Sequence, residues 1–126
     1  MGITHLLTKT QTREYDGGMS SSILLPEGER RIYFKARDGV EKGPFKNFSV
    51  RTRRVGGKIE QTIGGIVEDG PSLTFWKGEV LEEDNDSLRA HVAEFAALER
   101  SLKNLSEGRA PLFDGKEVYS KLYVGE

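Results

Sequence analysis

The sequence predicts a single α+β domain: an antiparallel sheet of about five to seven strands, built of hairpins, with one main amphipathic helix in its C-terminal half packed on it. Three observations predict this class. Two adjacent glycines interrupt an alternating stretch in mid-chain, other short alternating segments are bounded by Gly, Pro and Asp, and one long segment has apolar residues at helical spacing. At 126 residues the chain is long enough to bury a core.

The central stretch from Phe48 to Val67 is predicted to be a hairpin that turns at Gly56-Gly57. Both glycines can adopt the positive φ that two-residue hairpin turns require, so the register follows by counting. The predicted pairs are Val55/Lys58, Arg54/Ile59, Arg53/Glu60, Thr52/Gln61, Arg51/Thr62, Val50/Ile63, Ser49/Gly64 and Phe48/Gly65. The unlike charges of Arg53 and Glu60 face each other, which favours this register by about 0.2–1 kcal/mol.

Because side chains alternate across a strand, this hairpin has one apolar and one polar face. The apolar face consists of Phe48, Val50, Ile59 and Ile63. The polar face includes Arg51, Arg53, Lys58, Glu60 and Thr62. We expect the first face to belong to the core and the second to meet solvent.

Three strands are predicted on the N-terminal side of this hairpin. Ile3 to Tyr15 alternates only roughly, so a strand there would lie at a sheet edge, and Asp16-Gly17-Gly18 follows as a turn. Met19 to Leu25 is predicted as a strand that ends at Pro26-Glu27-Gly28, where we expect a turn and a second hairpin. Arg30 to Arg37 alternates well, with Ile32, Phe34 and Ala36 on one side and Arg31, Tyr33, Lys35 and Arg37 on the other.

Asp38 to Pro44 is predicted as the loop that leads to the central hairpin. Gly64-Gly65, inside the return strand, indicates a bulge, a bend or a close approach of another backbone or of a ligand, and we expect a bend. Leu73 to Val80 is the next predicted strand, with Leu73 and Phe75 on one face and Thr74 and Trp76 on the other. Trp76, the only tryptophan, is expected to serve packing unless its face is the open one.

Asp86 to Leu105 is predicted to be the main helix, because the acidic residues that precede it can cap its first turn. Its apolar residues fall near one side: Leu88, Val92, Phe95, Ala96, Leu98, Leu102 and Leu105. As an alternative, a short helix–helix dimer seam would use Leu88, Phe95 and Leu102 at a positions and His91, Leu98 and Leu105 at d positions. Gly108 is expected to end the helix, and Leu112 to Val124 to form a hairpin turning at Asp114-Gly115.

Composition and motifs exclude several kinds of chemistry. The chain has no cysteine, which excludes disulfides, thiolate metal ligands and cysteine nucleophiles. His5 and His91 lack a metal-binding spacing, and His91 is expected to be a partly buried packing residue with one nitrogen satisfied. Asp84-Asn85-Asp86 lacks the glycine and the acid that a calcium loop requires, and Gly57-Lys58 lacks the rest of a phosphate loop. We expect no catalytic site, metal or cofactor.

The net charge of -1 conceals a division along the chain. Residues 29–58 carry ten Lys/Arg against three acids, a balance of +7, whereas residues 60–107 carry four against eleven, a balance of -7. This division indicates a polyanion-binding face with an acidic part elsewhere. The alternative is that the two halves neutralise each other when they pack or dimerise. No secretory signal or membrane span is evident, and we expect a cytoplasmic protein.

If the strand from Arg30 to Arg37 and the central hairpin share a sheet, their cations line one face. Cations with an aromatic ring among them are typical of proteins that bind single-stranded DNA or RNA, whose rings stack on bases at about 1–3 kcal/mol each. Tyr33 is the expected stacking residue and Trp76 a second candidate. The predicted ligand-binding residues are Arg31, Tyr33, Lys35, Arg37, Arg51, Arg53, Lys58 and Trp76.

We therefore predict a small non-enzymatic binding module whose basic sheet face binds single-stranded nucleic acid, a nucleotide or another phosphate ligand. The alternative is an accessory or inhibitory protein of the small, cysteine-free kind found in phages and mobile elements, which blocks a host protein partner. A homodimer through the helix seam is a further alternative, and no membrane partner is expected.

Overall fold

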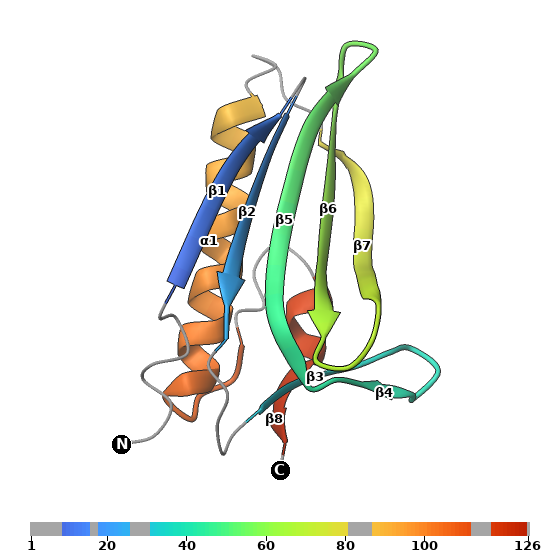
Figure 1. The fold of residues 1–126 in the computed structure, drawn as a ribbon, viewed down its shortest axis with the longest axis vertical. Helices are drawn as coiled ribbons and strands as arrows, with labels where there is room; N and C mark the ends of the chain where they lie inside the picture. The colour runs from blue at the N-terminus through green and yellow to red at the C-terminus, as the bar shows by residue number, and fades with distance from the viewer. Residues whose placement is uncertain (1–8, 16–17, 26–30, 81–86, 112–116, 126) are drawn as a thin grey trace.

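A computed structural model describes residues 9–15, 18–25, 31–80, 87–111 and 117–125. Their architecture is α+β, as predicted, with antiparallel sheets and one main helix in the C-terminal half (Figure 1). In chain order the elements are β1 Lys9–Tyr15, β2 Gly18–Leu24, β3 Arg31–Lys35, β4 Glu41–Lys42, β5 Phe45–Val55, β6 Lys58–Val67, β7 Ser72–Val80, α1 Ser87–Ser106, the 3₁₀ helix η1 Glu117–Lys121 and β8 Leu122–Gly125.

The larger sheet has the strand order β1-β2-β5-β6-β7 and is centred on the hairpin of β5 and β6. Every predicted pair of this hairpin is confirmed, from Val55 opposite Lys58 to Phe48 opposite Gly65. The two turn glycines have φ values of 56° and 80°, and open space surrounds them, so the turn requires glycine for its backbone conformation. β1 lies at the sheet edge, as predicted for that stretch, and pairs with β2.

The helix α1 packs on one face of this sheet, against β2 and β5, and the core lies between them (Figure 1). Leu98 and Leu102 of α1 are fully buried there. The predicted apolar face of the hairpin is confirmed, since none of its members is more than 1% exposed: Phe48, Val50, Ile59 and Ile63. The outer face of the sheet, which lies opposite the helix, carries the exposed side chains of Arg51, Arg53 and Lys58.

The second sheet has the order β4-β3-β8 and adjoins the lower end of the larger sheet in Figure 1. Ile32 and Phe34 of β3 are buried and Arg31 and Lys35 are exposed, as the alternation predicts. The prediction that β3 pairs in a hairpin with the preceding strand is wrong, because β2 pairs with β1 and β5. Alternation defines the faces of a strand but leaves its neighbours open, because many pairings satisfy the same pattern.

The hairpin predicted from Leu112 to Val124 is wrong over the part that the structure describes. Glu117–Lys121 forms η1, and only the residues after it form a strand, β8, which pairs with β3. Val118 and Tyr119 are adjacent and are 7% and 1% exposed, which a helical turn allows and a regular strand of alternating faces does not. The predicted turn Asp114-Gly115 lies outside the described residues.

A β-bulge in β7 determines where Trp76 points. Ile63 pairs with Trp76 but Gly64 pairs with Thr74, so Phe75 is an extra residue in β7. Phe75 and Trp76 therefore both pack against the core, although regular alternation places them on opposite faces. At Gly64-Gly65 the structure shows this bulge in the paired strand and a close approach of neighbouring backbone, since a Cβ on Gly65 would lie 2.6 Å from the carbonyl oxygen of Asn47.

The helix is confirmed, but its N-terminal half buries a different face from the predicted one. Leu88 and Val92 are 58% and 57% exposed, whereas His91 and Glu94 are buried. Glu94 Oε2 accepts a hydrogen bond of 2.6 Å from the hydroxyl of Tyr119. This bond satisfies the buried carboxylate of Glu94, a polar side chain that the predicted apolar stripe does not include. The predicted dimer seam is not available, because four of its positions are buried in the chain's own core: His91, Leu98, Leu102 and Leu105.

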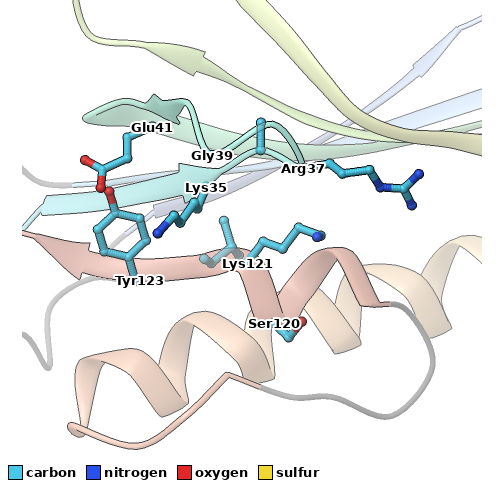
Figure 2. A pocket seen from close by; sticks show the side chains of 9 residues that line it. Lys35, Arg37, Gly39, Glu41, Ser120, Lys121 and Tyr123 are labelled. Atoms are coloured by element: carbon cyan, nitrogen blue, oxygen red, sulfur yellow. The ribbon is translucent and has the colours of Figure 1, made fainter.

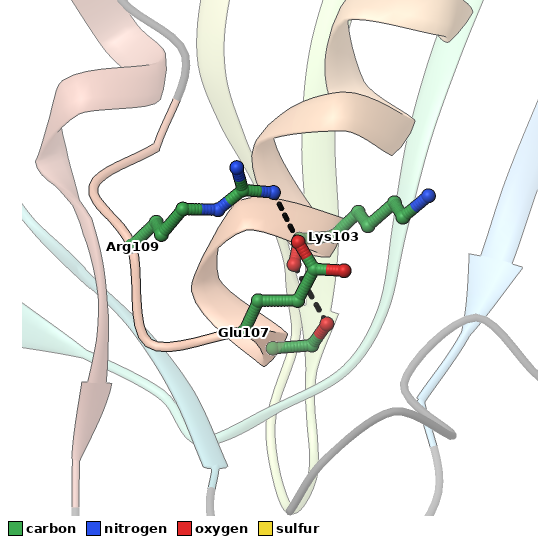
Figure 3. Close-up of polar contacts among 4 residues, drawn as sticks. Lys103, Glu107 and Arg109 are labelled. Carbon is green, nitrogen blue, oxygen red and sulfur yellow. Dashed lines mark hydrogen bonds and ion pairs between the residues drawn. The ribbon is translucent and has the colours of Figure 1, made fainter.

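The predicted helix stop at Gly108 is confirmed. Gly108 has a φ of 76°, its amide donates to the carbonyl oxygen of Leu105, and the amide of Arg109 donates to that of Asn104. This pair of bonds is a Schellman motif, which satisfies carbonyl groups that the helix leaves unpaired. An ion pair between Arg109 and Glu107 lies beside it, and Ser106 Oγ donates to the carbonyl oxygen of Lys103 (Figure 3).

A buried polar network joins α1 to three strands of the larger sheet. His91 Nε2 lies 2.7 Å from Ser21 Oγ, and His91 Nδ1 lies 2.7 Å from Thr52 Oγ1. Gln61 Nε2 donates to Thr52 Oγ1 and to the carbonyl oxygen of Ala90, both at 3.0 Å. Both imidazole nitrogens are bonded, one more than the sequence predicted.

Burial lowers the pKa of His91 below 6.5, the usual value, and this makes the stability depend on pH. In the unfolded chain His91 protonates near its usual pKa, so the unfolded state binds more protons as pH falls below about 6.5. We expect the free energy of unfolding to be constant above this range and to fall below it, by up to about 1.4 kcal/mol per pH unit. Urea unfolding between about pH 5.5 and 7.5, compared with His91→Gln, would measure this slope. Equal slopes for the two proteins would contradict it.

Candidate anion-binding surfaces

The predicted ligand-binding residues lie on two separate sheets. Arg31, Tyr33 and Lys35 belong to β3, and Arg37 lies in the turn that follows. Arg51 and Arg53 lie on β5 and Lys58 on β6, in the larger sheet. The proposition that all these cations line one face of a single sheet is therefore wrong, and Trp76 is separated from them because the bulge turns it toward the core.

Three of the predicted cations form ion pairs with acids of the acidic block, residues 60–107. Arg31 pairs with Glu68 at 3.5 Å, Arg53 with Glu60 at 3.7 Å and Lys58 with Glu79 at 3.6 Å. The pairs are partly exposed, so each contributes only about 0.2–1 kcal/mol to stability. They neutralise part of the positive balance of residues 29–58, as the alternative to a polyanion-binding face predicts.

The smaller sheet carries a pocket of about 520 Å³, which we call the small-sheet pocket. Its polar lining comes from β3 and its following turn, β4, η1 and β8, and consists of Lys35, Arg37, Glu41, Ser120, Lys121 and Tyr123 (Figure 2). Register explains why Lys35 and Lys121 line the same pocket. Phe34 is opposite Leu122, so the next residues outward, Lys35 and Lys121, emerge at the same end of the strand pair.

Three cations and one carboxylate line this pocket. Within the described residues, no carboxylate forms an ion pair with Lys35, Arg37 or Lys121. Arg37 and Lys121 extend in the same direction in Figure 2, whereas Lys35 extends the opposite way, toward the side of Tyr123, and Glu41 faces Tyr123. The cations of the pocket can therefore donate hydrogen bonds to the oxygens of a phosphate group.

Two stacked tyrosines adjoin the pocket. The rings of Tyr33 and Tyr123 lie opposite each other across β3 and β8, with centroids 5.6 Å apart and planes 21° apart. Gly43 lies against the Tyr33 ring, since a Cβ there would come within 2.8 Å of the ring edge. Tyr33 therefore packs within the sheet surface, and Tyr123 is the ring that lines the pocket. Burial and the neighbouring Glu41 carboxylate raise the pKa of Tyr123, which keeps its hydroxyl protonated.

The outer face of the larger sheet has a smaller hollow of about 210 Å³, which we call the outer-face hollow. It is lined by Arg51, Arg53, Glu60, Thr62 and Lys77. Thr62 is paired with Arg51 on one side and with Lys77 on the other, so these three residues form one row across adjacent strands. The ion pair of Arg53 and Glu60 forms the next row.

The sequence reasoning missed several residues of these two sites. Lys121 and Tyr123 alternate at the end of the chain, but nothing in that pattern identifies β3 as the partner of β8. Alternation predicts Thr62 on the polar face of the hairpin but does not assign it a binding role. Lys77 follows from the pairing of Thr62 only once the bulge in β7 is known.

The described residues contain no group of three or more His, Cys, Asp or Glu side chains arranged to hold a metal ion. The helices in the described part of the chain are too short or too polar to span a lipid bilayer. No family model, curated protein or solved structure matches the chain.

Proposed function

We propose that this protein is a binding module for a phosphate-bearing ligand and that the small-sheet pocket is its binding site. The observation that carries the proposal is that three cations, Lys35, Arg37 and Lys121, line one pocket without an ion pair to any described carboxylate. Three of the four predicted cations that lie outside this pocket, Arg31, Arg53 and Lys58, are paired with acids, so much of the positive charge on the other surfaces is offset.

The size and lining of the pocket indicate the class of ligand. Its volume of about 520 Å³ falls in the range of about 300–1,000 Å³ that is usual for small-molecule sites, so it can take a nucleotide-sized group. Arg37 can bind phosphate oxygens through two parallel hydrogen bonds, and the two lysines supply point charges. The ring of Tyr123 offers a surface on which a base can stack. A free nucleotide and a nucleotide within a single strand share this chemistry.

Neutralising two cations of the pocket is expected to weaken binding. In the variant Arg37→Gln/Lys121→Gln, the loss of two charge-assisted hydrogen bonds should reduce affinity at least about tenfold. Binding would be measured by calorimetry with ATP and by fluorescence anisotropy with a labelled oligothymidylate, at about 50 mM salt and at increasing salt. A preference for one probe distinguishes a free nucleotide from a single strand.

The control is Lys103→Gln, which removes one exposed cation from α1, away from both hollows. It should leave affinity within about twofold, since general electrostatic attraction is spread over the whole surface. Absence of binding by both probes at low salt, or equal losses in the control and in the double variant, would refute the proposed site.

A second candidate function, the blocking of a protein partner, is favoured by two exposed apolar side chains on α1. Leu88 and Val92 are one helical turn apart and more than half exposed. Apolar side chains exposed together are a feature of protein interaction sites. If this function holds, Leu88→Asp/Val92→Asp should abolish the recovery of one defined protein from a host lysate, whereas Arg37→Gln/Lys121→Gln should not.

A further inference from the structure

The outer face of the larger sheet has a regular chemical pattern that the small-sheet pocket does not use. Its register places Ser20, Arg51, Thr62 and Lys77 side by side on β2, β5, β6 and β7. A hydroxyl therefore alternates with a cation from strand to strand. A neighbouring row, closer to the smaller sheet, holds only small side chains, those of Ser22, Ser49, Gly64 and Thr74.

Three residues of the first row, Arg51, Thr62 and Lys77, line the outer-face hollow. Neighbouring strands are about 4.8 Å apart, so Arg51 and Lys77 stand about 9.5 Å apart with Thr62 between them. Their side chains rise from the same face as the hydroxyl of Thr62, and all three line the hollow. A small group placed above Thr62 would thus meet a hydroxyl beneath it and a cation on each side.

The ion pair of Arg53 and Glu60 closes one end of the hollow. Glu60 forms an ion pair with Arg53 at 3.7 Å, so the negative charge of its carboxylate is neutralised by that guanidinium. The lining counted as a whole has three cations and one carboxylate. The hollow therefore favours an anion, and no apolar side chain of its lining would attract a hydrophobic partner.

We propose that the outer-face hollow is a second anion site that binds a single phosphate group. Its volume of about 210 Å³ is below the usual range of about 300–1,000 Å³ for whole small-molecule ligands, so it suits one group rather than a complete nucleotide. Donors approach from three strands, which matches the three or four oxygens of a phosphate better than the two coplanar oxygens of a carboxylate. This site stands independently of the small-sheet pocket.

The test is a titration of the isotope-labelled full chain with inorganic phosphate, followed by the amide NMR signals. Chloride at equal ionic strength serves as the reference, because it screens charge without presenting several oxygens. We expect the amides of Thr62 and Lys77 to shift saturably with phosphate and little with chloride. Equal shifts with both anions, or no shift, would overturn the proposal.

Two substitutions distinguish a specific phosphate site in the outer-face hollow from general electrostatic attraction to the protein surface. Lys77→Gln removes one cation and Thr62→Val removes the hydroxyl while keeping a β-branched side chain suited to a strand. Each should weaken phosphate binding at these amides about fivefold or more, while Lys103→Gln leaves it unchanged. Weakening by Lys77→Gln but not by Thr62→Val would contradict the arrangement proposed here, because it would leave only a charge effect.

The same titration reports on the two sites separately. Shifts at Lys35 and Tyr123 report the small-sheet pocket, and shifts at Thr62 and Lys77 report the outer-face hollow. Loss of the first set with retention of the second refutes the proposed function alone, and the reverse refutes the second site alone. An oligothymidylate that displaces phosphate from Thr62 identifies a nucleic acid as the source of the phosphate group. If the oligothymidylate does not displace phosphate from Thr62, the source of the phosphate group is free phosphate.

Discussion

Replacement of His91 by alanine is expected to lower the free energy of unfolding by about 3–5 kcal/mol. His91 is 3% exposed, and its removal leaves a cavity between α1 and the larger sheet. It also takes a hydrogen-bond partner from Ser21 and from Thr52, both of which are buried. Unfolding in urea, followed by circular dichroism, would measure the loss through the midpoint of the transition.

The matched control is Val92→Ala on the next position of the same helix. Val92 is 57% exposed, so its truncation should change the free energy of unfolding by less than about 0.5 kcal/mol. The sequence pattern instead places Val92 on the apolar side of the helix, where its truncation would cost more than the structure predicts. A larger loss from Val92→Ala than from His91→Ala would show that the helix packs on the sheet through the face that the pattern predicts.

Replacement of Gly64 by alanine is expected to cost about 3 kcal/mol or more, because the added methyl group would overlap the carbonyl oxygen of Leu73. The obstacle is backbone, so no side-chain rotation relieves it, and β6 and β7 would have to separate where the bulge lies. The measurement is again the midpoint and slope of urea unfolding.

Gly70→Ala supplies the comparison for this substitution. A Cβ at Gly70 would lie 3.5 Å from the nearest side-chain atom of Val67, which is an ordinary contact. Its effect should stay within about 1 kcal/mol of zero. Equal effects at the two glycines would mean that the strands do not approach closely at Gly64, and the orientation of Trp76 would then lose its explanation.

The candidate sites show where sequence reasoning succeeded and where it stopped. Alternation identified the outward positions of β3 and of the central hairpin, and Lys35, Arg37 and Arg51 do line hollows. The pattern carried no information on which strands become neighbours. The small-sheet pocket is lined by both Lys35 and Lys121, and their placement in one pocket depends on pairing between strands far apart in the chain.

Local chemistry was sufficient for the α+β class, for the exact register of the central hairpin and for the end of the helix. Gly56, Gly57 and Gly108 each specify a backbone conformation with positive φ, which neighbouring residues alone can dictate. Tertiary packing decided the rest. Contacts between separate segments determine the division into two sheets, the inward orientation of Trp76 and the burial of His91. The energies of these contacts depend on both partners, so they cannot be read from one stretch of sequence.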